Sequence, residues 1–339
     1  MGTKPARHHK ETLVKTFKPW RALAGVALTL SLVPALCHAD PDYPTRPIRM
    51  IVPFTPGGAS DNLARALAAE LTKKLGQNAI VENKPGAGTV IGSQYVAHAS
   101  PDGYTLLWAT APLAINASLM KHLPYDTLND LTAVVDVASS PEVLVVNKSE
   151  NITTLQQLID KAKQNPGKLT YGSSGIGGSP HLATVMFAND AGIKLTHVPY
   201  QGSAPAVTAA MAGQVNLVID TFLTCLPGIN AGTLVPLAQT ESKRSSVLPN
   251  VPTMAEAGLK GYQASAWFSL LAPAKIPKPI VDKLNKTVNE IIKEPKFQAL
   301  FARQAIFMVG GTPDAAETHL KNEVARWQTA VKQSGASIE

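Results

Sequence analysis

Residues 48–60 read IRMIVPFTPGGAS, an apolar, strand-like run followed by a glycine-rich turn that opens a helix. A second stretch repeats this order, with Leu169–Tyr171 as the strand and Ser173–Ser179 as the turn. A helix start carries unpaired N–H groups and a partial positive charge, and glycine lets an anion approach its backbone. The two stretches therefore predict either two tight strand-to-helix turns or two anion-binding loops that share one ligand.

The first 39 residues have the composition of a secretory signal peptide. A basic segment ending at Arg21 precedes the uncharged run Ala22–Leu36, and the small residue Ala39 follows. The run is shorter than the roughly 20 residues that a membrane span needs. We expect cleavage after Ala39 and a free periplasmic protein. Acylation of Cys37 is the alternative, disfavoured because Leu36 directly precedes the cysteine where a small residue is required.

Charge and cysteine usage exclude several classes of protein. The chain has 31 Lys and Arg and 24 Asp and Glu, but six of the basic residues and one acid lie in the leader. The remaining chain is almost neutral, which does not favour a nucleic-acid surface. Outside the leader, Cys225 has no cysteine partner for a disulfide. The histidines there have no close metal-ligand spacing; they are His98, His122, His181, His197 and His319.

After Asp40, short β-like runs alternate with helical patterns, which is typical of an α/β fold with a largely parallel sheet. Leucines every four residues predict a helix that stops at Gly76, and Thr154 with Gln157 predicts a capping box. The predicted strands are Ile48–Val52, Ala79–Glu82, Thr105–Ala109, Leu169–Tyr171, Thr196–Val198, Leu217–Asp220 and Val235–Gln239. Further helices are predicted at 88–99, from near Ser203 and Thr224, at 279–292, weakly from Pro295, and at 313–332.

Two features indicate a division into lobes. The apolar runs Ala133–Ala138 and Val143–Val146 are broken by Ser139–Pro141, and a later apolar segment, Trp267–Ala272, precedes Pro273. We interpret these as two segments that cross between lobes around a ligand cleft. The first lobe would contain residues 40–140 and 265–339, and the second residues 141–264.

Six motifs, taken in order, resemble the periplasmic solute receptors of tripartite tricarboxylate transporters, often called Bug receptors. The resemblance covers nearly the whole chain after the leader, although no single motif is specific. One departure is Gly88-Thr89, where the family often has Gly-Gly, in a loop that we expect to lie outside the ligand grip. The motifs are VPFTPGG (52–58), ENKPGAG (82–88), SPDGYTLL (100–107), NPGKLTYG (165–172), HVPYQG (197–202) and PNVPTMAEAG (249–258).

The resemblance implies a type II periplasmic-binding-protein fold with a carboxylate ligand between its lobes and no cofactor. It also implies a monomer that delivers the ligand to integral-membrane transporter subunits. In this family, backbone N–H groups and bridging waters of the loop after the first strand hold the ligand carboxylate, here Phe54–Gly58. The ligand itself stays open among tricarboxylates, dicarboxylates, acidic amino acids and aromatic acids. The expected ligand-binding residues are Phe54, Thr55, Gly57, Gly58, Thr110, Ser173, Ser174, Gly177, Ser179, His181, Tyr200, Asp220 and Thr221.

Several of these side chains have alternative roles. His181 either bonds a ligand oxygen or is simply packed, and Asp220 either accepts from a ligand hydroxyl or ammonium or caps the next segment. Asp61 would repel a carboxylate, so we interpret it as stabilising the first turn of its helix.

Other functions fit the sequence less well. Ser173 or Ser174 with His181 and Asp220 would suggest a secreted hydrolase, but the five-residue nucleophile elbow is absent from the sequence. A dinucleotide fingerprint at 86–92 has its third glycine one position late and no acid after the next strand. A ligand-sensing protein with the same cleft remains an alternative, because receptor folds are reused for sensing.

Overall fold

The computed structural model describes residues 43–302 and 304–338. Its first strand group consists of β1 (Ile48–Val52) between β2 (Ala79–Asn83) and β3 (Thr105–Thr110), both parallel to it. The predicted signal peptide lies outside the described residues. Among the described helices, none is long and apolar enough to cross a membrane.

A second strand group has the same local arrangement. β5 (Thr170–Ser173) lies between β6 (Thr196–Pro199) and β7 (Leu217–Thr221), again with parallel pairing. In each group the helix that follows the central strand starts at a glycine-rich loop: α1 (Ala59–Leu75) after β1 and α5 (Ser179–Asp190) after β5. The prediction that both loops open helices is therefore confirmed.

One long strand, β4 (Leu131–Asn147), joins the two groups. Its residues 131–141 pair antiparallel with β9 (Ser265–Pro273), and its residues 142–146 pair antiparallel with β7. The strand order is β2-β1-β3-β9-β4-β7-β5-β6, with β8 (Leu234–Gln239) and β10 (Phe307–Met308) also paired to β4. The fold is α/β, but the expectation of a largely parallel sheet was wrong, because β4 and β9 make the sheet mixed.

The expected break at Ser139–Pro141 was also wrong. These residues are extended and pair with 265–267 of β9, so hydrogen bonds to a partner strand override their local preference for a turn. Register shifts occur nearby, between Ala133 and Val135 and between Asp136 and Ala138. Such bulges bend a strand without ending it.

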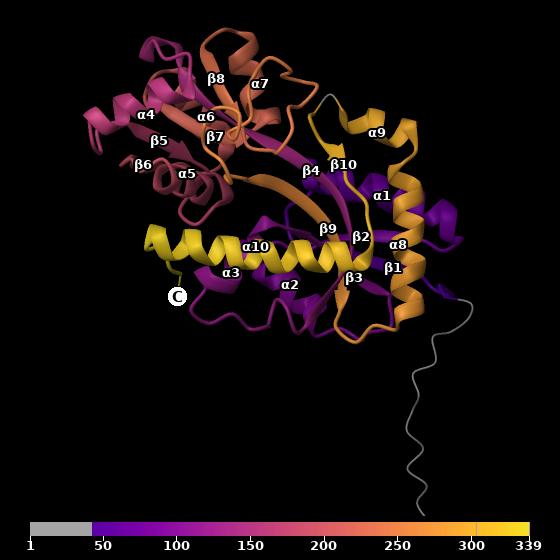
Figure 1. The fold of residues 1–339 in the computed structure, drawn as a ribbon. Helices are drawn as coiled ribbons and strands as arrows, with labels where there is room; N and C mark the ends of the chain where they lie inside the picture. The colour runs from indigo at the N-terminus through magenta and orange to yellow at the C-terminus, as the bar shows by residue number, and fades with distance from the viewer. Residues whose placement is uncertain (1–42, 303, 339) are drawn as a thin grey trace, which may run out of the picture. The chain divides into compact units, whose positions relative to one another are not determined.

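The helices cover both faces of each strand group (Figure 1). Buried side chains of α1 and α8 pack on one face of the first group, and those of α2, α3 and α10 pack on the other. In the second group, α4 and α5 cover one face, and α6 and α7 the other. The ranges are α2 Val90–Ala97, α3 Ala111–Leu119, α4 Leu155–Gln164, α6 Ser203–Met211, α7 Phe222–Asn230, α8 Lys278–Ile292, α9 Pro295–Ala302 and α10 Pro313–Ser334, with short 3₁₀ turns at Ala87–Thr89 and Lys148–Glu150.

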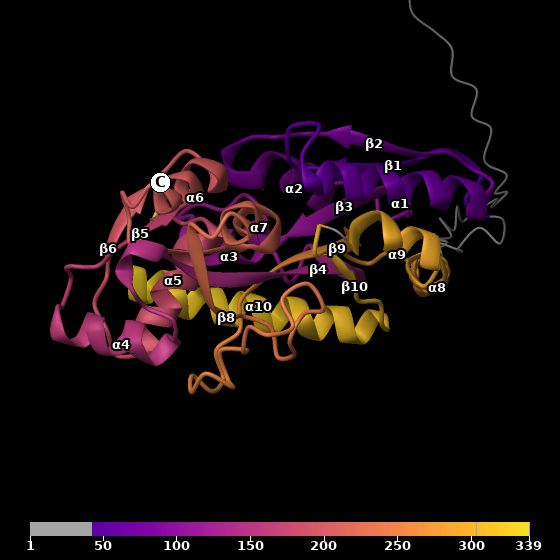
Figure 2. The same ribbon diagram turned by 90° about the horizontal axis from the view of Figure 1, so that it is seen from above.

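Helix α10 spans both strand groups (Figure 1 and Figure 2). It follows β10, packs on α3 and β4, and reaches α5, where Asn189 donates to Gln333 at 2.9 Å. Trp327, near the middle of this contact, is fully buried. The C-terminal helix therefore ties the two groups together.

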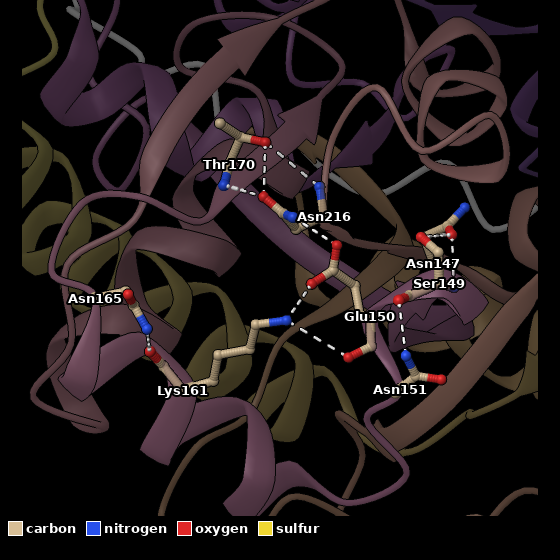
Figure 3. A network of polar contacts seen from close by, with 8 residues as sticks. All are labelled: Asn147, Ser149, Glu150, Asn151, Lys161, Asn165, Thr170 and Asn216. Atoms are coloured by element: carbon tan, nitrogen blue, oxygen red, sulfur yellow. Dashed lines mark hydrogen bonds and ion pairs between the residues drawn. The ribbon is translucent and has the colours of Figure 1, made fainter.

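A polar network fixes the outer end of the second group (Figure 3). Glu150 accepts from Lys161 Nζ and from Asn216 Nδ2, each at 2.7 Å. Asn216 Oδ1 in turn accepts from the backbone N–H of Thr170 at 2.6 Å. The capping box predicted at Thr154 and Gln157 is confirmed and starts α4 beside this network.

Candidate functional site

The loop after β1 is closed by a buried carboxylate. Gly57 N–H donates to Asp61 Oδ2 at 2.9 Å, and Asp61 also accepts from Arg65 Nε at 2.9 Å and Asn83 Nδ2 at 2.8 Å. Burial acts to raise the pKa of Asp61, but these hydrogen bonds outweigh it and hold the pKa below its usual value. The interpretation of Asp61 as a first-turn stabiliser is confirmed. Gly57 N–H, by contrast, is already used within the loop.

The loop before α5 is built in the same way with a histidine. Gly177 N–H donates to His181 Nδ1 at 3.1 Å, so in both loops the glycine N–H binds a side chain four residues later. His181 is buried and stacks on His197, with the ring centroids 4.1 Å apart. Burial, with a smaller contribution from His197, lowers the pKa of His181 to about 4. His181 is thus a neutral, packed side chain that shapes the loop.

The N–H groups of Gly57 and Gly177 are used within their loops, but other backbone N–H groups stay open to a ligand. The first N–H groups of a helix have no acceptor within the helix, and Gly58, at the N-cap of α1, is exposed. A Cβ built on Gly58 would meet no atom within 4 Å. The open donors of the first loop therefore begin at Gly58.

A cavity of about 660 Å³ lies between the two loops. Phe54 and Thr55 line it from the first loop, and Ile176–Gly178 from the second. The segment Pro85–Thr89, which we expected to lie outside the ligand grip, also forms part of its wall. The remaining lining is Pro53, Pro112, Ile115, Asn116, Leu119, Met120 and Ile338, and no lining side chain carries a charge.

The second loop approaches helix α3 closely beside this cavity. A Cβ on Gly177 would lie 2.5 Å from Leu119 Cδ2 of α3, and Gly177 has a positive φ of 75°. Only glycine fits both constraints. The second loop therefore contacts α3 of the first group through the backbone of Gly177, with no side chain between them.

The serine side chains of the second loop are held by protein groups. Ser173 is fully buried, and its Oγ lies 2.6 Å from His197 Nε2. Ser179 Oγ donates to Glu142 Oε1 at 3.4 Å. The Ser173–His181–Asp220 triad of the hydrolase alternative is not formed, because Ser173 pairs with His197 and Asp220 binds Thr221 N–H and Thr224.

Other expected ligand-binding residues lie at strand ends away from the cavity lining. Thr110 is the N-cap of α3, and Thr221 is the N-cap of α7. Tyr200 follows β6 and donates its N–H to Ser173 O at 3.0 Å. The half-buried Ser174 precedes Gly175 in the second loop. Among the expected residues, Phe54, Thr55 and Gly177 line the cavity, and Ser179 adjoins it in sequence. Gly58 is not a lining residue and lies three positions after Thr55.

Sequence reasoning missed Glu142. This residue of β4 is 1% exposed, lies opposite Thr221 in the β4–β7 pairing and contacts Ser179. Its position directly before the apolar run Val143–Val146 was the available signal, since an acid at the end of a buried strand needs a polar partner. Among the described residues, no cluster of three or more potential metal ligands was found.

Comparison with known proteins identifies the class. Residues 63–336 match the family model of the tripartite tricarboxylate transporter family receptor. The chain belongs to this family, which consists of periplasmic solute-binding receptors and not of enzymes. The resemblance inferred from the six motifs is confirmed.

Individual relatives agree with this assignment. The chain is 39% identical to protein BugT of Bordetella pertussis, over 94% of this chain and 98% of BugT. It is 37% identical to the structure of R. palustris Rpa4515 with adipate, with a TM-score of 0.73 over 87% of this chain and 99% of that one. It is 34% identical to periplasmic binding protein BugD, with a TM-score of 0.70 over 88% of this chain and all of that one.

Proposed function

We propose that this receptor captures a carboxylate with an apolar body, in the cavity between the loops after β1 and β5. The observation that carries the proposal is an uncharged cavity lined by Gly178, the N-cap of α5, and by Phe54 and Thr55 of the loop that leads into α1. Helix N-termini stabilise an anion without a cationic side chain. Apolar side chains such as Ile115, Leu119 and Ile176 would contact the body of the ligand.

The absence of charge in the lining also limits how many carboxylate groups a ligand can bury in the cavity. Each carboxylate moved from water into this cavity needs hydrogen bonds or a countercharge, and the lining offers no cation. A ligand with one buried carboxylate and a second at the cavity mouth meets this limit, whereas three clustered carboxylates do not. A linear dicarboxylate such as adipate, the ligand named for the related Rpa4515 structure, is the first candidate.

The proposal includes a division into two lobes that close on the ligand. Residues 40–140 with 265–339 would form one lobe, and 141–264 the other. The transfer of β4 from β9 to β7 at residues 141–142 supports this division. A ligand held by both loops narrows the gap between the strand groups, which is a hinge closure.

A binding panel tests the proposed ligand class. Adipate is expected to bind with a micromolar dissociation constant, about 8 kcal/mol, and citrate much more weakly. At 100 times its dissociation constant, adipate should add about 2.7 kcal/mol to the free energy of unfolding. Thermal shift and calorimetry measure both quantities, and small-angle scattering of the same samples should show a more compact particle with adipate.

The variant Gly58→Val provides the site control for this panel. Its side chain has room, so the fold should persist, but it covers the first open N–H groups of α1. We expect adipate affinity to fall at least tenfold, about 1.4 kcal/mol. Citrate binding more tightly than adipate, or unchanged affinity in the folded variant, would contradict the proposal.

We further propose that the protein is an exported monomer that delivers its ligand to the integral-membrane subunits of a tripartite transporter. The leader composition and the family support export. The mature chain is then expected to begin at Asp40. Intact-mass measurement of the periplasmic fraction checks this; a mass that includes residues 1–39, or lipid on Cys37, would refute it.

A further inference from the structure

The wall of the cavity between the two loops contains two buried polar side chains. They are Thr89, at the N-cap of α2, and Asn116 of α3, which are 5% and 3% exposed. The other polar side chain of the lining, Thr55, is exposed. Asn116 follows Ile115 and precedes Leu119 in α3, and both of these apolar residues belong to the same wall. A ligand that fills the cavity therefore covers a polar spot within an apolar surface.

The amide of Asn116 is fixed by the turn that precedes α2. Its Nδ2 donates to Gly88 O at 2.7 Å and to Thr89 Oγ1 at 3.4 Å, which uses both amide hydrogens. Asn116 Oδ1 accepts no hydrogen bond from the residues that the structure describes, and it is not one of their unpaired atoms that are sealed from solvent. Asn116 therefore has an unused acceptor that is open to the cavity.

Thr89 has the complementary group. Its Oγ1 accepts from Asn116, and it makes no capping hydrogen bond to α2. Within the described part of the chain, its O–H hydrogen thus has no acceptor. One unused donor and one unused acceptor lie side by side in the cavity wall, on side chains that are already bonded to each other.

The backbone holds Thr89 in an unfavourable conformation. Its φ is 82°, in the left-handed region that β-branched residues rarely adopt. The turn that enforces this value is closed by Thr89 N–H, which donates to Gly86 O at 3.1 Å, and by the bond from Asn116 to Gly88 O. Such strain persists only where the surroundings enforce it, and it is concentrated at functional sites.

We propose that Thr89 and Asn116 bind a hydroxyl group of the ligand, so that the receptor prefers a hydroxylated dicarboxylate. A hydroxyl donates to Asn116 Oδ1 and accepts from the Thr89 hydroxyl, which satisfies both groups. A methylene in that place leaves two buried groups unpaired, and a carboxylate cannot donate to Oδ1. This inference rests on the proposed carboxylate-binding function and narrows its ligand class.

Calorimetry with matched dicarboxylates tests the preference. 2-Hydroxyadipate and 3-hydroxyadipate each add one hydroxyl to adipate, so the comparison isolates that group. At least one of them should bind about tenfold more tightly than adipate, or better. The corresponding oxo acids, 2-oxoadipate and 3-oxoadipate, can accept from Thr89 but cannot donate to Asn116. They should bind less tightly than the preferred hydroxy acid.

Two variants of Thr89 assign the preference to its hydroxyl. Glycine adopts a positive φ without strain, so Thr89→Gly should melt at the same temperature as the unaltered protein or higher. Its preference for the hydroxy acid over adipate should nevertheless fall about tenfold. Thr89→Ser keeps the hydroxyl and is the matched control, so it should retain the preference. A purely structural role of Thr89 would not change the ratio of the two dissociation constants.

The possible outcomes separate the two proposals. Equal affinity for adipate and both hydroxyadipates, or a preference that is unchanged in Thr89→Gly or lost in Thr89→Ser, would overturn the role of this pair and leave the receptor function intact. Failure of the unaltered protein to bind adipate or either hydroxyadipate would overturn both.

Discussion

Replacing Glu323 by alanine is expected to lower the free energy of unfolding by about 3–5 kcal/mol. Glu323 of α10 is 2% exposed and accepts three hydrogen bonds. The donors are Trp267 Nε1 at 2.7 Å, Trp327 Nε1 at 2.8 Å and Arg326 at 2.6 Å. Alanine would leave two indole N–H groups and a guanidinium without this acceptor, and α10 would lose its polar tie to β9.

Urea denaturation followed by tryptophan fluorescence measures this effect, because two of the three donors are indoles. The control is Asp282→Ala, which removes the exposed ion pair with Lys278 and should cost less than about 1 kcal/mol. The loss of stability in Glu323→Gln should lie between those of Glu323→Ala and Asp282→Ala, because an amide keeps one acceptor oxygen. A loss below 1 kcal/mol for Glu323→Ala would show that the acid does not stabilise this junction.

Replacing Asp61 by alanine is expected to cost about 2–4 kcal/mol of stability and to weaken adipate binding at least tenfold. The change frees Gly57 N–H, Arg65 and Asn83 together and removes the group that closes the first loop. Without that closure, the N–H groups from Gly58 onward lose their fixed direction. Paired urea and calorimetry measurements separate the two effects.

The stabilisation by Asp61 also has a defined pH dependence. Its pKa is lower in the folded protein than in the unfolded chain, so its contribution is complete above about pH 4 and is lost as pH falls through the folded-state pKa. Asp61→Ala should therefore lose less additional stability than the unaltered protein on acidification below pH 4. Equal acid sensitivity of both proteins, or full adipate affinity in the variant, would contradict this role.

Much of the local structure was predictable because its signals are short-range. β1 has the predicted bounds, α1 ends at Gly76 in a left-handed conformation, and the Thr154 capping box forms as expected. Helix α3 was not predicted. Its segment APLAINASL lacks a polar face that would reveal a helical period, and most of its side chains are buried.

The errors arose where distant residues decide the outcome. Ser139–Pro141 reads locally as a turn, and only pairing with residues 265–267 makes it a strand. The glycines of the two loops were correctly recognised as helix openers. Their N–H groups were assigned to the ligand, however, because the sequence does not reveal that Asp61 and His181 turn back to accept from them. Glu142 was missed for the same reason, since its partners come from β7, α5 and the segment after β8.

The place of β9 in the sheet has a consequence for folding during synthesis. β9 separates β3 from β4, although both of those strands are made more than 110 residues earlier. Until residues 265–273 have emerged, β3 and β4 each present an unpaired edge and the two strand groups are not joined through β9. Sheets completed by such distant pairing form slowly. A nascent chain of this protein therefore stays incompletely folded until about four-fifths of it has been translated.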